Sequence, residues 1–265
     1  MLDRFNLSLA KPVSTLMDPG ARFSKEQCPS TPTQVAKMRG ILYAEGIGSV
    51  LWPVMILRPD CAFAISTLAQ FVQNPAKIYW EALKRVMVYL GSTKALSLTF
   101  EGGPLAKPIA KGYCDADWAG QPHRHSILGY SFHLGLGAVS WSSKKQYIIA
   151  LSSTESKYIA LAHSVKEGVW LRYLISEILD TKPTTMGVNC DNKGAIALTK
   201  DNKFHQRSKH IDIHYHYIHE AVEDEQIKVS YIPTDQNPAN IFTKPLPKPK
   251  FRQFMGMLGL RAMED

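Results

Sequence analysis

Hydrophobic and polar positions change their spacing near the middle of the chain. Up to about residue 100, apolar residues recur at three- and four-residue intervals, which is typical of amphipathic helices. This spacing predicts helices over Thr33–Leu51, from Pro59 to about Val72, and over Lys77–Leu90, the last one ended by Gly91. The residues before them contain several Pro and Gly breakers and predict loops.

A second pattern begins after the Gly- and Pro-rich stretch EGGPLAKP at Glu101–Pro108. Three closely linked runs predict strands at Ile109–Asp117, Ser126–Leu134 and Ala138–Ile148, which we expect to be antiparallel neighbours. We place a domain boundary at the joint. Residues 1–108 then form a small, mostly helical segment, and residues 109–265 form a second domain.

The clearest helix start in the chain is at Ser152, because Glu155 follows three residues later with capping-box spacing. Helix and strand then alternate, which predicts an α/β domain with a mixed sheet and flanking helices. The remaining predicted elements are a strand at Thr185–Cys190, a helix at Asn192–Lys200, a His-rich helix at Ile211–Glu223, a strand at Ile227–Ile232 and a last turn or helix at Pro238–Phe242.

Composition narrows the class of protein. The 265 residues include 45% apolar residues, which fits a globular chain. Lys and Arg number 31 against 23 Asp and Glu, so the formal charge of +8 suits a polyanionic partner such as nucleic acid. Four widely spaced cysteines exclude a disulfide scaffold and a zinc ribbon. No signal peptide or transmembrane segment is evident, which predicts an intracellular protein of the cytoplasm or nucleus without a membrane partner.

Two acidic residues end predicted strands. Asp115 ends the first strand of the second half, and Asp191 ends the fourth. Such strands can be neighbours in a mixed sheet, so that both carboxylates face one crevice and hold a divalent metal ion. The alternative is that each aspartate is a helix N-cap or a turn residue.

A series of motifs carries a family resemblance. The order GYCDADWAG, ILGYSF, GAVSWSSKKQ, ALSSTESKYIAL, CDNKGAIAL, KHIDIHYHYIHE and YIPTDQNPANIFTKPLP resembles the ribonuclease H domain of copia-type retrotransposon Pol polyproteins. Upstream, KPVSTLMDPG, LRPDCAFAIS and NPAKIYWEALKRVMVYLGSTK resemble the thumb or connection segment that follows the reverse transcriptase palm in those polyproteins. Nearly the whole chain is covered.

The resemblance implies a fold, a reaction and partners. The family fold is a five-stranded mixed sheet with flanking helices, and its reaction is hydrolysis of the RNA strand of an RNA–DNA hybrid. Four carboxylates hold two Mg²⁺ ions there, with Mn²⁺ as a possible substitute. The implied partners are an RNA–DNA hybrid or another nucleic acid, and the rest of the Pol polyprotein.

The catalytic positions depart from the family pattern. Asp115 and Asp191 match the first and third acids, but the second falls on Lys157 in SSTESKY and the fourth on Asn240 in DQNPANIFTK. A lysine ammonium would repel each metal ion by roughly 4 kcal/mol per unit-charge contact at about 4 Å. Asp117 is the best local stand-in ligand. The resemblance thus implies a nuclease inactivated at two positions; the alternatives are a non-catalytic nucleic-acid-binding module and a transposon relic without function.

Other polar and aromatic residues have two interpretations each. Lys144, Lys145, Arg207 and Lys209 could line a nucleic-acid track, although basic residues near loops are usually just solvated. In the His-rich segment, His210 and His214 have the spacing of a zinc pair, although incidental histidines on a half-exposed helix are the simpler interpretation. The remaining expectation concerns packing, which is predicted for Trp118, Trp141 and Trp170.

Overall fold

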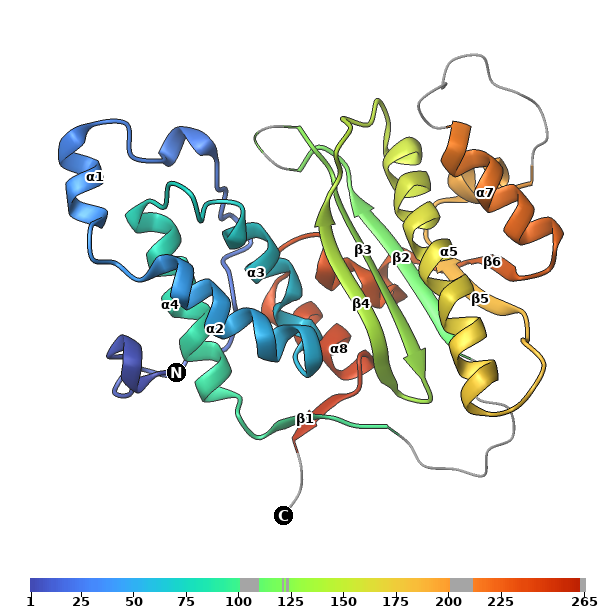
Figure 1. Ribbon diagram of the computed structural model, residues 1–265, viewed down its shortest axis with the longest axis horizontal. Coiled ribbons are helices and arrows are strands. Elements are labelled where there is room, and N and C mark those ends of the chain that lie inside the picture. The colour runs from blue at the N-terminus through green and yellow to red at the C-terminus, as the bar shows by residue number, and fades with distance from the viewer. Residues whose placement is uncertain (101–109, 121, 123, 201–211, 263–265) are drawn as a thin grey trace.

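A mixed five-stranded sheet forms the centre of the second half of the chain (Figure 1). The computed structural model describes residues 1–100, 110–120, 122, 124–200 and 212–262. The sheet has the order β4-β3-β2-β5-β6, in which β2 pairs antiparallel with β3 and parallel with β5. This confirms the α/β class and the mixed sheet. The strands are β2 (Lys111–Asp117), β3 (Ile127–Leu134), β4 (Gly137–Lys145), β5 (Met186–Cys190) and β6 (Ile227–Tyr231).

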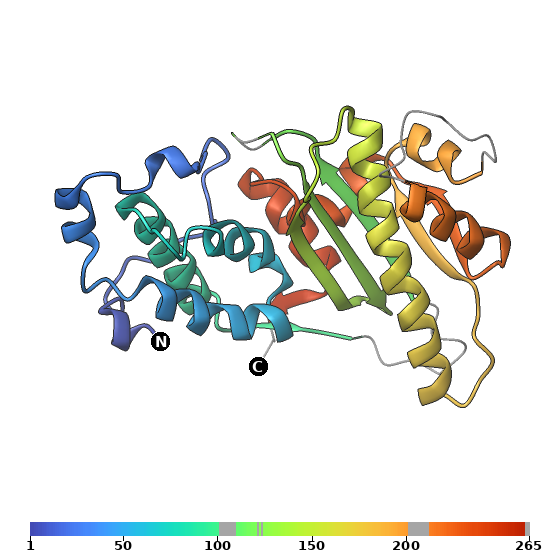
Figure 2. The ribbon, with the colours of Figure 1, turned by 45° about the horizontal axis from the view of Figure 1, so that its top comes forward.

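Three helices accompany this sheet on one side. The long helix α5 (Ser153–Ile178) lies along the sheet, with α6 (Lys193–Leu198) and α7 (Asp212–Glu223) beside it (Figure 2). Its start is where the sequence predicts it, because the Ser152 side chain accepts a hydrogen bond from the Glu155 backbone N–H at 3.1 Å. Leu161 and Val165 of α5 pack against Phe132 and Val188 of the sheet and are fully buried.

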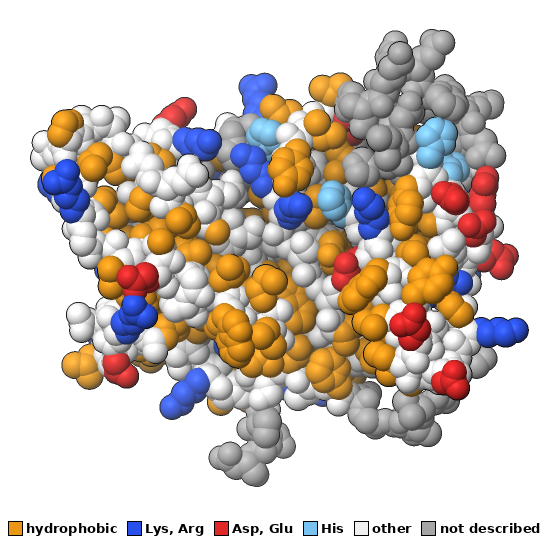
Figure 3. Space-filling model, in the orientation of Figure 1, with side chains coloured by type: hydrophobic (Ala, Val, Ile, Leu, Met, Phe, Trp, Pro, Cys, Tyr) orange, Lys and Arg blue, Asp and Glu red, His pale blue; other side chains and the backbone are white. Residues whose placement is uncertain are grey.

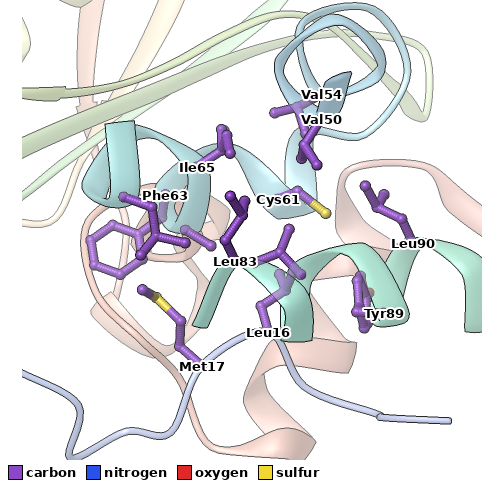
Figure 4. Close-up of a cluster of buried hydrophobic side chains, with 14 of the residues drawn as sticks. Leu16, Met17, Val50, Val54, Cys61, Phe63, Ile65, Leu83, Tyr89 and Leu90 are labelled. Atoms are coloured by element: carbon purple, nitrogen blue, oxygen red, sulfur yellow. The ribbon is translucent and has the colours of Figure 1, made fainter. Parts of the chain in front are cut away.

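The other side of the sheet is covered from both ends of the chain. The C-terminal element η5 (Pro238–Phe242) and the N-terminal helix α3 (Ala62–Ala69) contact it, and α8 (Lys248–Met257) packs against η5. One hydrophobic cluster joins these parts, and its N-terminal side is shown in Figure 4. The short strand β1 (Leu96–Leu98) also pairs antiparallel with β7 (Leu260–Ala262). Residues 1–100 are therefore packed onto the sheet, while the predicted boundary at 108/109 lies outside the described residues.

Two helix predictions in the first half are wrong in detail. The expected helix Thr33–Leu51 is two helices, α1 (Pro32–Met38) and α2 (Tyr43–Ile56), separated at Gly40, whose φ of +83° breaks the helix. Gly91 does not end its helix either, because α4 runs over Lys77–Ser92. Leu2 lies where a side chain at position 91 would be, so this glycine serves close packing.

Apolar side chains reach the surface over the end of α2, where Trp52 and Met55 are exposed (Figure 3). The packing prediction is also wrong for Trp118 and Trp170, which are about half exposed, whereas the Trp141 indole N–H donates to the Val54 carbonyl at 3.2 Å. Within the described part of the chain, no helix combines the length and apolarity that crossing a bilayer requires.

Candidate functional site

The two predicted aspartates lie on neighbouring parallel strands. Cys114 of β2 is paired in register with Cys190, the last residue of β5, and an aspartate follows each cysteine directly. Because the two strands run in the same direction, Asp115 and Asp191 reach the same end of the sheet. Both side chains are withdrawn from solvent, with exposed fractions of 0% and 1%. The structure thus brings the predicted pair together in a buried position.

A lysine lies between these two carboxylates. Lys157, one turn into α5, places its Nζ 2.6 Å from Asp115 Oδ1 and 2.5 Å from Asp191 Oδ1. The Lys157 side chain is only 16% exposed. Such short contacts between charged groups are charge-assisted hydrogen bonds, which are roughly twice as strong as neutral ones. The ammonium group bridges the two strands at the point where the resemblance implies metal ions.

Hydroxyl groups complete the coordination of both carboxylates. Thr243 donates to Asp115 Oδ2 at 2.6 Å, and Thr234 donates to Asp191 Oδ2 at 2.7 Å. Thr243 can come this close because Gly129, opposite Asp115 in the sheet, has no side chain to collide with Phe242. Each aspartate therefore accepts a hydrogen bond from the Lys157 ammonium and from one threonine hydroxyl. Neither threonine was predicted from the sequence, although each lies within the motif YIPTDQNPANIFTK.

Asn240 belongs to the same network but turns its amide to the backbone. Its Nδ2 donates to the Thr234 carbonyl at 2.9 Å and to the Asn237 carbonyl at 2.8 Å. Its Oδ1 is buried and has no hydrogen-bond partner among the residues that the structure describes. The side chain therefore fixes the loop that carries Thr234. An aspartate in the same orientation would face two carbonyl oxygens, so an acid at this position must turn elsewhere.

The charges within the cluster stabilise one another. Burial alone would raise the pKa of the Asp115 carboxyl, but the charges of Lys157 and Lys244 and the hydrogen bonds from Lys157 and Thr243 hold that pKa below its ordinary value. Burial alone would lower the pKa of Lys157, and the charge of Asp115 with the hydrogen bonds to both aspartates raises it instead. Lys157 is thus a protonated cation, which cannot act as a nucleophile or a base.

The residues present do not fit a two-metal site. The lysine ammonium occupies the space between Asp115 and Asp191, and the fourth position is an amide already bonded to backbone. Burial raises the pKa of Asp117, and this side chain does not complete a ligand set. Among the described residues, no group of three or more His, Cys, Asp or Glu side chains could hold a metal ion. His210, and the side chain of His214, lie outside the described part, so the zinc alternative is not addressed.

These pKa shifts predict that the free energy of unfolding decreases in acid. The carboxyl pKa of Asp115 is depressed below 3.8, so its contribution is present above that pH and disappears as pH falls through the lower folded-state value. The pKa of Lys157 is raised above 10.5, so its contribution is complete below that pH and is lost only at higher pH. We expect denaturant midpoints to fall more steeply below about pH 4 for the original chain than for Asp115→Asn. Parallel curves for the two chains would contradict the ion pair.

The predicted nucleic-acid lysines lie at the same end of the sheet. Asp115, Gly129 and Ser143 form one row across β2, β3 and β4, and Lys144 and Lys145 follow Ser143 directly. Neighbouring strands are about 4.8 Å apart, which places the Ser143 position roughly 10 Å from that of Asp115. Arg207 and Lys209 lie outside the described residues.

Basic residues of the N-terminal segment join this area. Burial and the charge of Lys25 lower the pKa of Lys145, so Lys25 lies near it. The charge of Arg22 likewise acts on Asp117, at the end of β2. Lys244 lies 3.8 Å from Asp115 Oδ2. No sequence signal pointed to Arg22 or Lys25, because their proximity to the sheet depends on how residues 1–100 pack.

The fold and the site together define an α/β protein with a ribonuclease H-like sheet and a buried carboxylate pair at the ends of its two central strands. No protein-family model matches the chain. It is 41% identical, over 263 residues, to the "Retrovirus-related Pol polyprotein from transposon TNT 1-94" of Nicotiana tabacum, which covers 99% of this chain and 20% of that protein. The chain belongs to the copia-type retrotransposon Pol polyproteins, as its motifs predicted.

Two other proteins that the chain is similar to are not Pol polyproteins. The chain is 45% identical over 135 residues to "Secreted RxLR effector protein 161" of Plasmopara viticola, a match that covers 51% of this chain and 94% of that protein. Among solved structures, LC11-RNase H1 isolated from compost covers 52% of this chain at 15% identity, with a TM-score of 0.39. The chain spans about a fifth of the length of the tobacco polyprotein.

Proposed function

We propose that this chain is a non-catalytic nucleic-acid-binding module whose ancestral ribonuclease H site is closed by Lys157. The observation that carries the proposal is the position of Lys157 Nζ, 2.6 Å and 2.5 Å from the two carboxylates that would otherwise hold metal. A metal ion could enter only by displacing a buried cation that is already fully paired. The chain is therefore expected not to cleave an RNA–DNA hybrid with either Mg²⁺ or Mn²⁺.

The binding part of the proposal is supported by charge and placement. The chain carries a formal charge of +8. Lys144 and Lys145 lie at the end of the sheet where Asp115 and Asp191 are paired with Lys157, and the charge of Lys25 acts on Lys145. Lysine side chains that are not in ion pairs with carboxylates can bind phosphates. Phosphate contacts dominate the affinity of proteins for nucleic acid. An RNA–DNA hybrid is the partner that we propose, with the rest of a Pol polyprotein as the protein context.

Binding and cleavage should separate in one experiment. We expect a short labelled RNA–DNA hybrid to be bound equally with Mg²⁺ or a chelator present, with affinity that falls as salt rises, and to stay intact on a gel. Lys144→Glu with Lys145→Glu should weaken binding and lower the salt slope by about 1 for each lost phosphate contact.

The matched control reverses two other lysines, Lys182 and Lys228, which are not at the sheet end that carries Asp115. The control variant has the same net charge as Lys144→Glu with Lys145→Glu. If the control variant retains binding, the loss in the other variant is specific to the surface around Lys144 and Lys145. Mg²⁺-dependent cleavage by the original chain would overturn the closed site, and salt-independent or absent binding would overturn the RNA–DNA hybrid as the partner.

A further inference from the structure

The loop between β4 and α5 displays apolar side chains in a regular alternation. Tyr147, Ile149 and Leu151 have exposed fractions of 82%, 51% and 82%. Between them, Ala150 is buried and Ile148 packs against the same small hydrophobic cluster. Apolar side chains rarely face water in a row without a partner that covers them. The alternation shows that Tyr147, Ile149 and Leu151 point to solvent, while Ile148 and Ala150 between them pack against the protein.

Hydrogen bonds fix this loop in place. The Gln146 backbone N–H donates to the Ser126 carbonyl at 2.8 Å, and its side-chain Nε2 donates to the Ser156 carbonyl at 2.8 Å. The Trp118 indole N–H donates to the Ala150 carbonyl at 2.9 Å, and the Leu151 N–H donates to Glu155 Oε2 at 2.7 Å. The exposed side chains therefore need little further ordering when they bind a partner, which favours affinity.

Aromatic and basic groups meet on this surface. Trp118, 47% exposed, follows Asp117 at the end of β2 and is joined to the loop through Ala150. Lys144 Nζ lies 5.1 Å from the centroid of the Tyr147 ring, at the end of β4. Figure 3 shows Lys or Arg and apolar side chains next to one another above the ends of the sheet strands. The loop leads directly into the turn of α5 that carries Lys157.

We propose that Trp118, Tyr147 and Lys144 form a stacking surface for unpaired bases of a single-stranded nucleic acid. This proposal rests on the proposed function and names a feature of its ligand. A paired duplex hides the faces of its bases, so it would use the lysines but not the exposed rings. An unpaired base offers a face to Tyr147 or Trp118 while its phosphate meets Lys144, a combination typical of single-strand binding sites.

The ring of Tyr147 provides the sharpest test. With a labelled oligothymidylate, Tyr147→Ala should bind roughly 10-fold more weakly, because stacking on one ring typically contributes this much or more. Tyr147→Phe keeps the ring and should stay within about 2-fold of the original chain. Trp170→Ala removes another exposed aromatic, in the second half of α5, and serves as the control that should bind normally. Photocrosslinking of a 5-bromouracil strand should recover a peptide that contains Tyr147 or Trp118.

The outcomes distinguish this proposal from the broader one. Equal affinity of the original chain and Tyr147→Ala for the single strand, or a crosslink elsewhere, overturns the stacking surface. An equal loss of affinity of Tyr147→Ala for an intact hybrid also overturns it, since the Tyr147 ring would then contribute to binding without unpaired bases. If the chain binds hybrid with salt dependence but not single strands, the proposed function stands and the stacking surface fails. If it binds single strands through Tyr147 but not the hybrid, the stacking surface stands and hybrid binding fails.

Discussion

A chain carrying Lys157→Glu together with Asn240→Asp is expected to cleave the RNA strand of a hybrid in Mg²⁺. The cluster of Asp115, Lys157, Asp191 and Asn240 has one net negative charge, because the lysine cancels one of two carboxylates. The double variant places four carboxylates at these positions and removes the buried cation. Restoring such electrostatic complementarity should raise the cleavage rate on the order of 10²-fold or more above the original chain.

The single variants make this expectation specific. Asn240→Asp alone should stay inactive, because Lys157 would still bridge both strands. Lys157→Glu alone should give less activity than the double variant, since Asn240 would still direct its amide to the Thr234 and Asn237 carbonyls. Asp115→Asn in the double variant should abolish cleavage and exclude a contaminating nuclease. The closure proposal is wrong if the original chain cleaves hybrid and its own Asp115→Asn variant does not.

Lys157→Ala is expected to be the most destabilising change at the site. It would leave Asp115 and Asp191 buried, close together and without the ammonium that pairs them. Removing one partner of a buried ion pair typically costs about 3–5 kcal/mol in the free energy of unfolding. For a chain of this size that corresponds to a fall in melting temperature on the order of 10 °C. Thermal and denaturant unfolding would measure it.

Three comparisons identify the cause of that loss. Lys166→Ala removes an exposed lysine from the same helix and should change stability by no more than about 0.5 kcal/mol. Adding Asp115→Asn and Asp191→Asn to Lys157→Ala should recover much of the loss, because no buried charge is then left unpaired. Mg²⁺ should raise the melting temperature of Lys157→Ala more than that of the original chain, since a vacated carboxylate pair attracts cations. Equal stabilities of Lys157→Ala and the original chain would show that the ion pair contributes nothing.

Lys157 illustrates how far sequence reasoning about the site could go. Its place in SSTESKY predicts a charge reversal at a position where the resemblance implies an acid, and that prediction needs no structure. The sequence suggested only repulsion between this lysine and metal ions. That the ammonium instead pairs with both aspartates depends on the distance between α5 and the ends of β2 and β5. A distance between elements far apart in the chain is set by packing, which no local motif contains.

Local signals determined most of the second half of the fold. The strands β2, β3 and β5, and the start of α5 at Ser152, follow from alternation, turn residues and a capping box. The first half was predicted less well, because the break at Gly40 and the continuation of α4 past Gly91 depend on a single positive φ and on the packing of Leu2. Neither changes the helical periodicity from which helices are predicted.

The sequence by itself determined the family, the mixed α/β sheet and the residue types at four motif positions, Asp115, Lys157, Asp191 and Asn240. Those features follow from residue types and from the spacing of apolar residues over short stretches, which do not depend on how distant segments pack. Tertiary structure alone decided that Lys157 fills the site, that Lys25 joins Lys145, and that Tyr147 and Trp118 face solvent. The direction and surroundings of a side chain follow from which distant segments pack together, and many segments of similar composition could have packed there instead.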